Sequence, residues 1–184
     1  FAMTPILTNP LIHSTMPPVA FALKHPLPTD YRVATIHGDL HVHNVLIDER
    51  GDTWLIDFAN SDEGPLLQDY VTFEASMLIE MTDEVTDWEL LCEWSLLLTD
   101  PHQPLPPLPP HLAALPQLAR AHTAAGAVRD LARGHMEPGE RTYLVCLLYT
   151  ALRMMTVKFL APGKSLHALI LAAVVAQALA APEE

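Results

Sequence analysis

The sequence predicts an α+β fold that is mainly helical and contains one small β-hairpin. Two short apolar segments, residues 45–47 and 55–56, flank a turn at residues 48–52, which indicates a pair of antiparallel strands. Beyond residue 64, apolar residues recur every three to four positions, a period that is typical of helices. Residues 32–36 precede the hairpin segment and are expected to form a further short strand.

The composition is that of a folded domain and not of a disordered chain. Of the 184 residues, 50% are hydrophobic and 17% are charged, so the chain can bury a sizeable core. The formal net charge of −12 argues against a surface for nucleic acid or for anionic membranes, because both need clustered Lys and Arg. No nucleic acid or membrane partner is therefore expected.

Two regions are expected along the chain. Six prolines interrupt residues 1–30, so we expect a proline-rich extended segment there, without a helix or strand of useful length. Residues 31–184 are expected to form a single domain, since no internal repeat or second domain is visible.

Five helices are expected after the hairpin, at residues 65–81, 86–98, 117–134, 138–160 and 165–180. A capping box formed by Thr86 and Glu89 would open the second of these. Seven prolines between residues 100 and 116 predict a loop with at most a short turn at 111–115. The fourth helix is expected to carry a basic outer face that includes Arg141 and Arg153. The fifth is apolar on nearly all sides, which predicts a buried core helix or an interface.

The two cysteines and the first residues predict a cytoplasmic protein. Cys92 and Cys146 both lie in apolar helical patterns, as expected of buried free thiols in a reducing compartment. The chain opens on Phe1 without the charged region and cleavage site of a signal peptide, and such a start suggests a trimmed chain or a fragment.

Three oxygen-bearing side chains are expected to meet at one end of the hairpin. Asp39 and Asn44 lie five residues apart in a loop before the first strand, and the turn returns Asp57 to the neighbourhood of Asn44. Two carboxylates and an amide oxygen suit magnesium, which takes oxygen ligands and keeps its other positions for phosphate and water.

These residues carry a resemblance to known proteins. His37-Gly38-Asp39, with Asn44 five residues later and then Ile56-Asp57-Phe58, resembles the catalytic loop and metal-binding segment of kinase-like phosphotransferases, especially the aminoglycoside and choline phosphotransferases. The stretch from about residue 36 to 69 also resembles the ternary complex associated domains, kinase-like modules of bacterial multidomain proteins. The resemblance implies the carboxy-terminal lobe of a protein-kinase-like fold.

The resemblance also implies roles for individual residues. Asp39 would position or deprotonate the acceptor hydroxyl, while Asn44 and Asp57 would hold Mg²⁺ on the phosphates of ATP or another nucleotide. Asp69 would brace the loop by accepting its backbone amides, and His37 would pack under the loop and bond backbone near Asp57. The alternative for Asp69 is a solvated carboxylate in the first turn of a helix.

The sequence departs from the family pattern in lacking the parts that hold the nucleotide phosphates. No glycine-rich phosphate loop is present. Residues 19–24 are similar to the strand that carries the phosphate-pairing lysine, but only twelve residues separate Lys24 from His37, too few for a lobe. We therefore expect a catalytic lobe that needs a complementary amino-terminal lobe, with the isolated chain inactive.

Two alternatives belong to other classes. The first is a catalytically inactive regulatory or scaffolding module that keeps the lobe for binding. The second is a metal-dependent hydrolase built on His37, Asp39, His41 and His43, since side chains two apart on an extended segment face the same way. In the phosphotransferase hypothesis, His41 and His43 are residues of the loop surface.

The expected partners are a nucleotide, an unidentified hydroxyl-bearing acceptor, and a cover for the hairpin. A missing lobe would leave the hairpin surface around Val45, Ile47 and Trp54 open to water. We expect residues 1–30, or a second copy of the chain in a two-fold dimer, to cover it.

Overall fold

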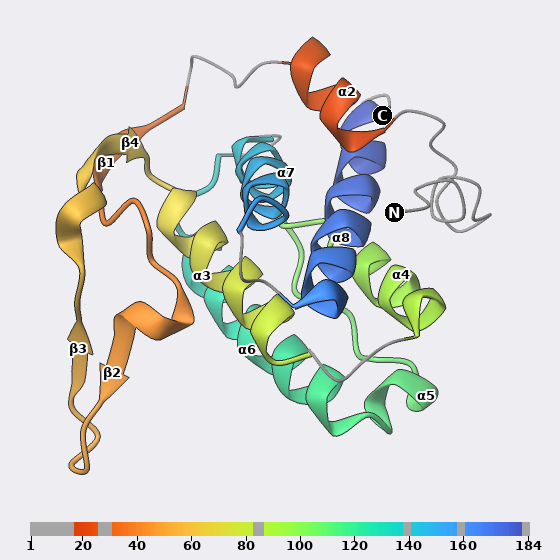
Figure 1. The fold of residues 1–184 in the computed structure, drawn as a ribbon, viewed down its shortest axis with the longest axis horizontal. Helices are drawn as coiled ribbons and strands as arrows, with labels where there is room; N and C mark the ends of the chain where they lie inside the picture. Colours follow the sequence, from red (N-terminus) through yellow and green to blue (C-terminus); the bar gives the residue numbers. More distant parts are fainter. Residues whose placement is uncertain (1–16, 26–30, 83–86, 138–140, 158–160, 182–184) are drawn as a thin grey trace.

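A computed structural model of the chain describes residues 17–25, 31–82, 87–137, 141–157 and 161–181. Its helices pack together, and two short β-ribbons lie along one side of them (Figure 1). The elements are, in chain order, α2 (Pro18–Lys24), β1 (Val33–Ile36), η1 (Val42–Asn44), β2 (Val45–Ile47), β3 (Thr53–Leu55), η2 (Phe58–Asn60), β4 (Asp62–Pro65), α3 (Gln68–Glu80), α4 (Trp88–Leu96), α5 (Pro110–Ala113), α6 (Pro116–Arg133), α7 (Thr142–Met154) and α8 (Pro162–Ala180). The prediction of a mainly helical α+β fold is confirmed.

Helix α8 forms the centre of the helical layer. Every residue from His167 to Ala176 is buried, and the helix packs against α2, α4 and α7. A helix that is apolar on all sides must be covered on all sides, so the predicted core helix is confirmed. By length and composition alone α8 could also cross a membrane, but a buried core helix meets the same criterion.

The other helices follow the sequence pattern with shifted ends. Helix α3 begins at Gln68, because Pro65 belongs to a strand, and α7 ends at Met154, before the expected boundary at residue 160. Helix α4 is capped by Asp87, whose side chain accepts from the backbone of Glu89 and Leu90. The predicted capping box at Thr86 is therefore wrong, since the neighbouring aspartate caps the helix. Thr86 and Pro138 themselves lie outside the described residues.

A fully buried ion pair joins three of the helices. Glu74 of α3 accepts from Arg129 of α6 through Nε and Nη2, at 3.0 and 2.8 Å to Oε1. Tyr143 of α7 donates to the other carboxylate oxygen, and Arg129 also donates to the carbonyl of Leu98 at 2.8 Å. Burial opposes the guanidinium charge, yet the carboxylate prevails and raises the pKa of Arg129. The pair holds α3, α6 and α7 in register, and α3 and α7 carry the walls of the site below.

Helix α2 corrects the expectation for the first thirty residues. Pro18 occupies the first helical turn, where a missing N–H costs nothing, and the helix then buries Phe21 and Ala22 against α7 and α8. Residues 18–24 are thus helical and not extended. Lys24 therefore lies on a helix and not on a strand, as expected when the similarity to the lysine-bearing kinase strand was rejected. Residues 1–16 and 26–30 lie outside the described part.

Two antiparallel ribbons present the loop that carries Asp39. The expected hairpin is present, with β2 paired to β3 so that Val45 faces Leu55. Strand β1 pairs with β4, placing Ile36 opposite Asp62. Strand β4 is so short and polar that it has no apolar alternation, and only its partner reveals it. The β1–β4 pairing brings the two ends of the 37–61 segment together.

Candidate functional site

A residue in the first turn of α3 holds the loop that begins at His37. Asp69 accepts two backbone hydrogen bonds, from the N–H of His37 at 2.7 Å and from the N–H of Gly38 at 3.1 Å. The two carboxylate oxygens thus satisfy two consecutive amides that point into the fold. These are the contacts through which the predicted bracing role would act, and they replace the alternative of a solvated carboxylate.

Gly38 allows the sharp turn between these two bonds. Its φ is +79°, and a Cβ at this position would lie 2.2 Å from the carbonyl oxygen of Asn60. Left-handed backbone and close approach both require glycine here. The loop is therefore held closely against the segment that follows Asp57.

His37 links the two motifs. Its Nε2 lies 2.8 Å from the carbonyl oxygen of Ile56, and its Nδ1 accepts from the N–H of Asp39 at 3.4 Å. With Nδ1 as acceptor, Nε2 carries the proton and donates to Ile56. The ring also packs on Phe58, with ring centroids 4.8 Å apart. This buried histidine spans from the Asp39 backbone to the residue before Asp57.

Asn44 is a buried side chain with an unused oxygen. Its Nδ2 donates to the carbonyl of Asp39 at 2.9 Å, which fixes the amide plane. Within the described part of the chain, its Oδ1 has no hydrogen-bond partner. Its own carbonyl accepts from Ile56 at 3.1 Å, so Asp57 follows the residue bonded to Asn44.

Asp57 has an unusual backbone conformation. Its φ is +64°, and it is the single non-glycine residue with positive φ among the described residues. Such strain costs about 1–3 kcal/mol and gathers at functional sites. The side chain is exposed, and its carboxylate has no partner in the described ranges. Asn44 Oδ1 and the Asp57 carboxylate are the hard oxygen donors that Mg²⁺ prefers, so these residues fit the metal that the sequence predicts.

The Asp39 carboxylate is bonded to a residue that the sequence did not connect with it. Arg153, near the end of α7, donates from Nη2 to Oδ1 at 2.9 Å, and His41 Nε2 lies 3.7 Å from Oδ2. Arg153 was expected on a basic outer face, and its side chain is 52% exposed, but it also reaches across to the Asp39 loop. The two residues are 114 positions apart, and no sequence signal joins them.

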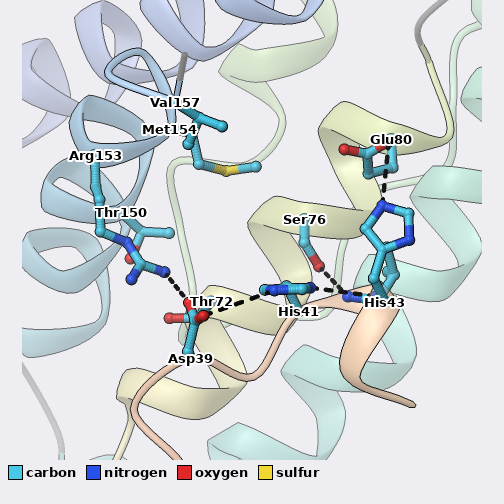
Figure 2. Close-up of a pocket in the computed structure, with 11 residues that line it drawn as sticks. Asp39, His41, His43, Thr72, Ser76, Glu80, Thr150, Arg153, Met154 and Val157 are labelled. Carbon is cyan, nitrogen blue, oxygen red and sulfur yellow. Dashed lines mark hydrogen bonds and ion pairs between the residues drawn. The ribbon is translucent and has the colours of Figure 1, made fainter. Parts of the chain in front are cut away.

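A cavity of 340 Å³ opens beside this ion pair, between η1, α3 and α7 (Figure 2). Its lining residues are Asp39, His41, Val42, His43, Thr72, Ser76, Glu80, Thr150, Arg153, Met154 and Val157. Ser76 fixes the η1 wall, because its Oγ accepts from the Val42 N–H at 3.1 Å. A second cavity of 220 Å³ adjoins the first, and Thr72, Thr150 and Arg153 line both.

The histidines do not form the chelate that a metal-dependent hydrolase needs. His43 is exposed, with its Nε2 3.8 Å from Glu80 Oε2, while His41 is only partly covered. The Nε2 of His37 is bonded to the carbonyl oxygen of Ile56 and is not grouped with the other two histidines. Among the described residues, no three His, Cys, Asp or Glu side chains are grouped to hold a metal.

The hairpin surface is open. Its apolar side chains remain strongly exposed: Leu46, Ile47, Trp54, Leu55, Ile56 and Phe58, with Ile47 at 70% and Trp54 at 58%. Figure 1 shows the hairpin projecting beyond the helices, whereas α2 packs on α7 and α8. The described part of residues 1–30 therefore does not cover it.

Comparison with known proteins identifies one relationship. No curated protein and no solved structure matches the chain. The family model of ternary complex associated domain 9 matches residues 14–156, which span most of the chain and include the loop, the hairpin and every residue that lines the two cavities except Val157. The chain belongs to the ternary complex associated domain 9 family.

Proposed function

We propose that this chain is the catalytic lobe of a kinase-like phosphotransferase, which transfers a phosphoryl group from a nucleotide such as ATP to a hydroxyl acceptor. In this proposal the acceptor oxygen forms a bond to the γ-phosphorus while the bond from that phosphorus to the bridging oxygen of the leaving diphosphate breaks. The hydroxyl proton passes to the carboxylate of Asp39.

One observation carries the proposal, namely the unused oxygen of the buried Asn44 side chain. The polar atoms of a side chain as buried as this one normally have hydrogen-bond partners, and an accessible oxygen left without one is available to a ligand. The amide is held so that Nδ2 bonds the Asp39 backbone and Oδ1 is left over. Asp57 follows Ile56, whose N–H donates to the Asn44 carbonyl, so Asn44 and Asp57 would together hold a magnesium ion, which would satisfy that oxygen.

In this proposal the residues of the chain have separate roles. Asp69 and His37 hold the loop in one conformation, and this sets the position of the Asp39 carboxylate. Asn44 and Asp57 would hold Mg²⁺, which supplies charge neutralisation on the transferring phosphates when bound. Such preorganisation accounts for most of the catalysis in phosphoryl transfer, because the protein contributes little covalent chemistry.

Manganese binding tests the metal site directly. We expect the isolated chain to bind Mn²⁺ or Mg²⁺ weakly, with a dissociation constant on the order of millimolar, because magnesium is seldom held by protein groups alone. Paramagnetic broadening of NMR signals should centre on Asp57 and disappear in Asp57→Ala. Broadening centred on His41 and His43 would contradict this assignment and favour the hydrolase.

Phosphoryl transfer is tested by turnover of radiolabelled ATP with the chain and with Asp39→Ala. We expect the chain alone to be very slow, since its sequence has no glycine-rich loop to clamp the β- and γ-phosphates. Measurable turnover that is lost in Asp39→Ala would support transfer and would show that no other lobe is needed. No turnover, together with no ATP-induced shift of Asn44 or Asp57 in the presence of Mg²⁺, would contradict the proposal.

The exposed hairpin favours one second candidate, a binding module that uses the lobe as a scaffold. Contiguous exposed apolar side chains mark interaction sites, and a two-stranded hairpin is marginal alone in water. Sedimentation of the chain beside Ile47→Ser and Trp54→Ser measures whether a second copy covers this surface. A dimer that dissociates in these variants would support the predicted two-fold assembly, and a monomer in all three would exclude it.

A further inference from the structure

Arg153 has most of its hydrogen-bonding capacity unused. A guanidinium carries five N–H donors, and Asp39 takes one of them in the structure. No other bond to this side chain is found among the described residues, and the side chain is 52% exposed. The remaining donors lie where the 340 Å³ cavity meets its 220 Å³ neighbour, because Arg153 lines both.

Two threonine hydroxyls at the same junction also lack partners within the described ranges. Thr72 is 3% exposed and Thr150 is 7% exposed, and both side chains line both cavities. Neither hydroxyl makes a hydrogen bond within the described ranges, whereas other helical threonines, such as Thr123, bond the carbonyl four residues back. The two residues are buried, but their oxygens are not among the fully buried atoms without a partner, so a ligand in the cavity can bond them.

The cavity lies on the acceptor side of Asp39 rather than on the metal side. Neither Asn44 nor Asp57 lines either cavity, while Asp39 lines the larger one. In Figure 2, Arg153 reaches down from α7 to Asp39 and forms one wall, opposite Ser76 and His41. A molecule in this cavity can present a hydroxyl to Asp39 without displacing a nucleotide on Asn44 and Asp57.

The charged groups of the cavity are paired, and unused hydrogen-bond donors remain for a ligand. At its far end Glu80 is already neutralised, because Lys164 donates to its carboxylate. At the near end Asp39 is neutralised by one arm of Arg153. What remains is a fork of guanidinium donors flanked by two hydroxyls, a geometry that suits a carboxylate or a phosphate.

We propose that the acceptor is a small alcohol that carries an anionic group, and that Arg153, Thr72 and Thr150 bind this group while its hydroxyl reaches Asp39. This inference rests on the proposed function, since it names the substrate class of the same site. The net charge of −12 repels an anion at long range, so recognition depends on these short-range bonds. The apolar wall of Met154 and Val157 contacts the carbon chain between the two groups.

Calorimetric titration of the chain, without nucleotide or metal, tests the inference. The probes are glycerol 3-phosphate, glycerate, glycerol and choline, which differ in charge at similar size. We expect one or both anionic alcohols to bind, and we expect the dissociation constant to rise at least about tenfold in Arg153→Met. Thr150→Val should weaken binding by a smaller factor. Arg50→Met, a change at an exposed arginine in the hairpin turn, should leave the affinity unchanged.

The two anionic probes separate the source of the charge. A preference for glycerol 3-phosphate assigns a phosphate, and a preference for glycerate assigns a carboxylate. Failure of both to bind, binding of glycerol or choline with equal affinity, or an unchanged affinity in Arg153→Met would overturn the inference. Because no nucleotide is present, the result is independent of turnover. Phosphoryl transfer to neutral alcohols alone would refute the anion site and keep the proposed function. Anion binding without any phosphoryl transfer would keep the anion site and count against the proposed function.

Discussion

Asp69→Ala removes the acceptor of two backbone amides and tests how the loop that carries Asp39 is held. The N–H of His37 belongs to a residue that is only 6% exposed, so this donor has little access to water when its acceptor is lost. An unsatisfied buried donor costs about 1–3 kcal/mol. The bond from Gly38 is longer, at 3.1 Å, and that residue is partly accessible, so its loss should cost less. Together these contributions predict a destabilisation of about 2–3 kcal/mol.

Urea denaturation followed by circular dichroism measures this loss, with the m-value confirming that the unfolding transition itself is unchanged. Glu63→Ala is the matched control, because Glu63 is an exposed carboxylate on β4 whose side chain makes no bond within the described ranges. The control should change stability by less than about 0.5 kcal/mol. Equal and near-zero effects of the two substitutions would refute the bracing role of Asp69.

Three further perturbations follow from the structure. Gly38→Ala should cost at least about 1–2 kcal/mol in the same melt, because alanine is strained at positive φ and its Cβ would clash with Asn60; a neutral effect would contradict the turn geometry. Arg129→Met should cost about 3–5 kcal/mol by leaving the Glu74 carboxylate buried and unpaired, and adding Glu74→Met should recover much of that loss in the melt. Burial lowers the pKa of His167 from 6.5 to about 4, so the folded state resists protonation and stability falls as the pH drops from about 6.5 to 4. This contributes about 3 kcal/mol, which pH-dependent melts should show as a slope that is smaller in His167→Leu.

The helices and the hairpin could be predicted because their signals are local. Apolar residues at a period of three to four mark α3, α6, α7 and α8, and their observed spans agree with the pattern to within a few residues. The ends were less predictable, since they depend on neighbours, as where Asp87 caps α4. Helix α2 is not evident from its proline content, because prolines usually interrupt helices, whereas Pro18 stands in the first turn, where it is tolerated.

The loop residues were predictable in kind but not in their contacts. The motif with Asp39, Asn44 and Asp57 is visible as a spacing in the sequence. The free Oδ1 of Asn44 and the left-handed backbone of Asp57 are properties of the folded segment. Such details depend on which atoms approach within about 3 Å, a distance that spacing alone does not resolve.

The sequence by itself determined the helical class of this protein, its hairpin, and the residues that mark the candidate site. Only the tertiary structure decided that β1 pairs with β4, that Glu74, Arg129 and Tyr143 meet in the core, and that Arg153 reaches Asp39. The physical reason is the distance along the sequence over which each kind of interaction acts. Periodicity and turn chemistry act over a few residues, whereas these contacts join segments from 26 to 114 residues apart and arise when buried helix faces pack together.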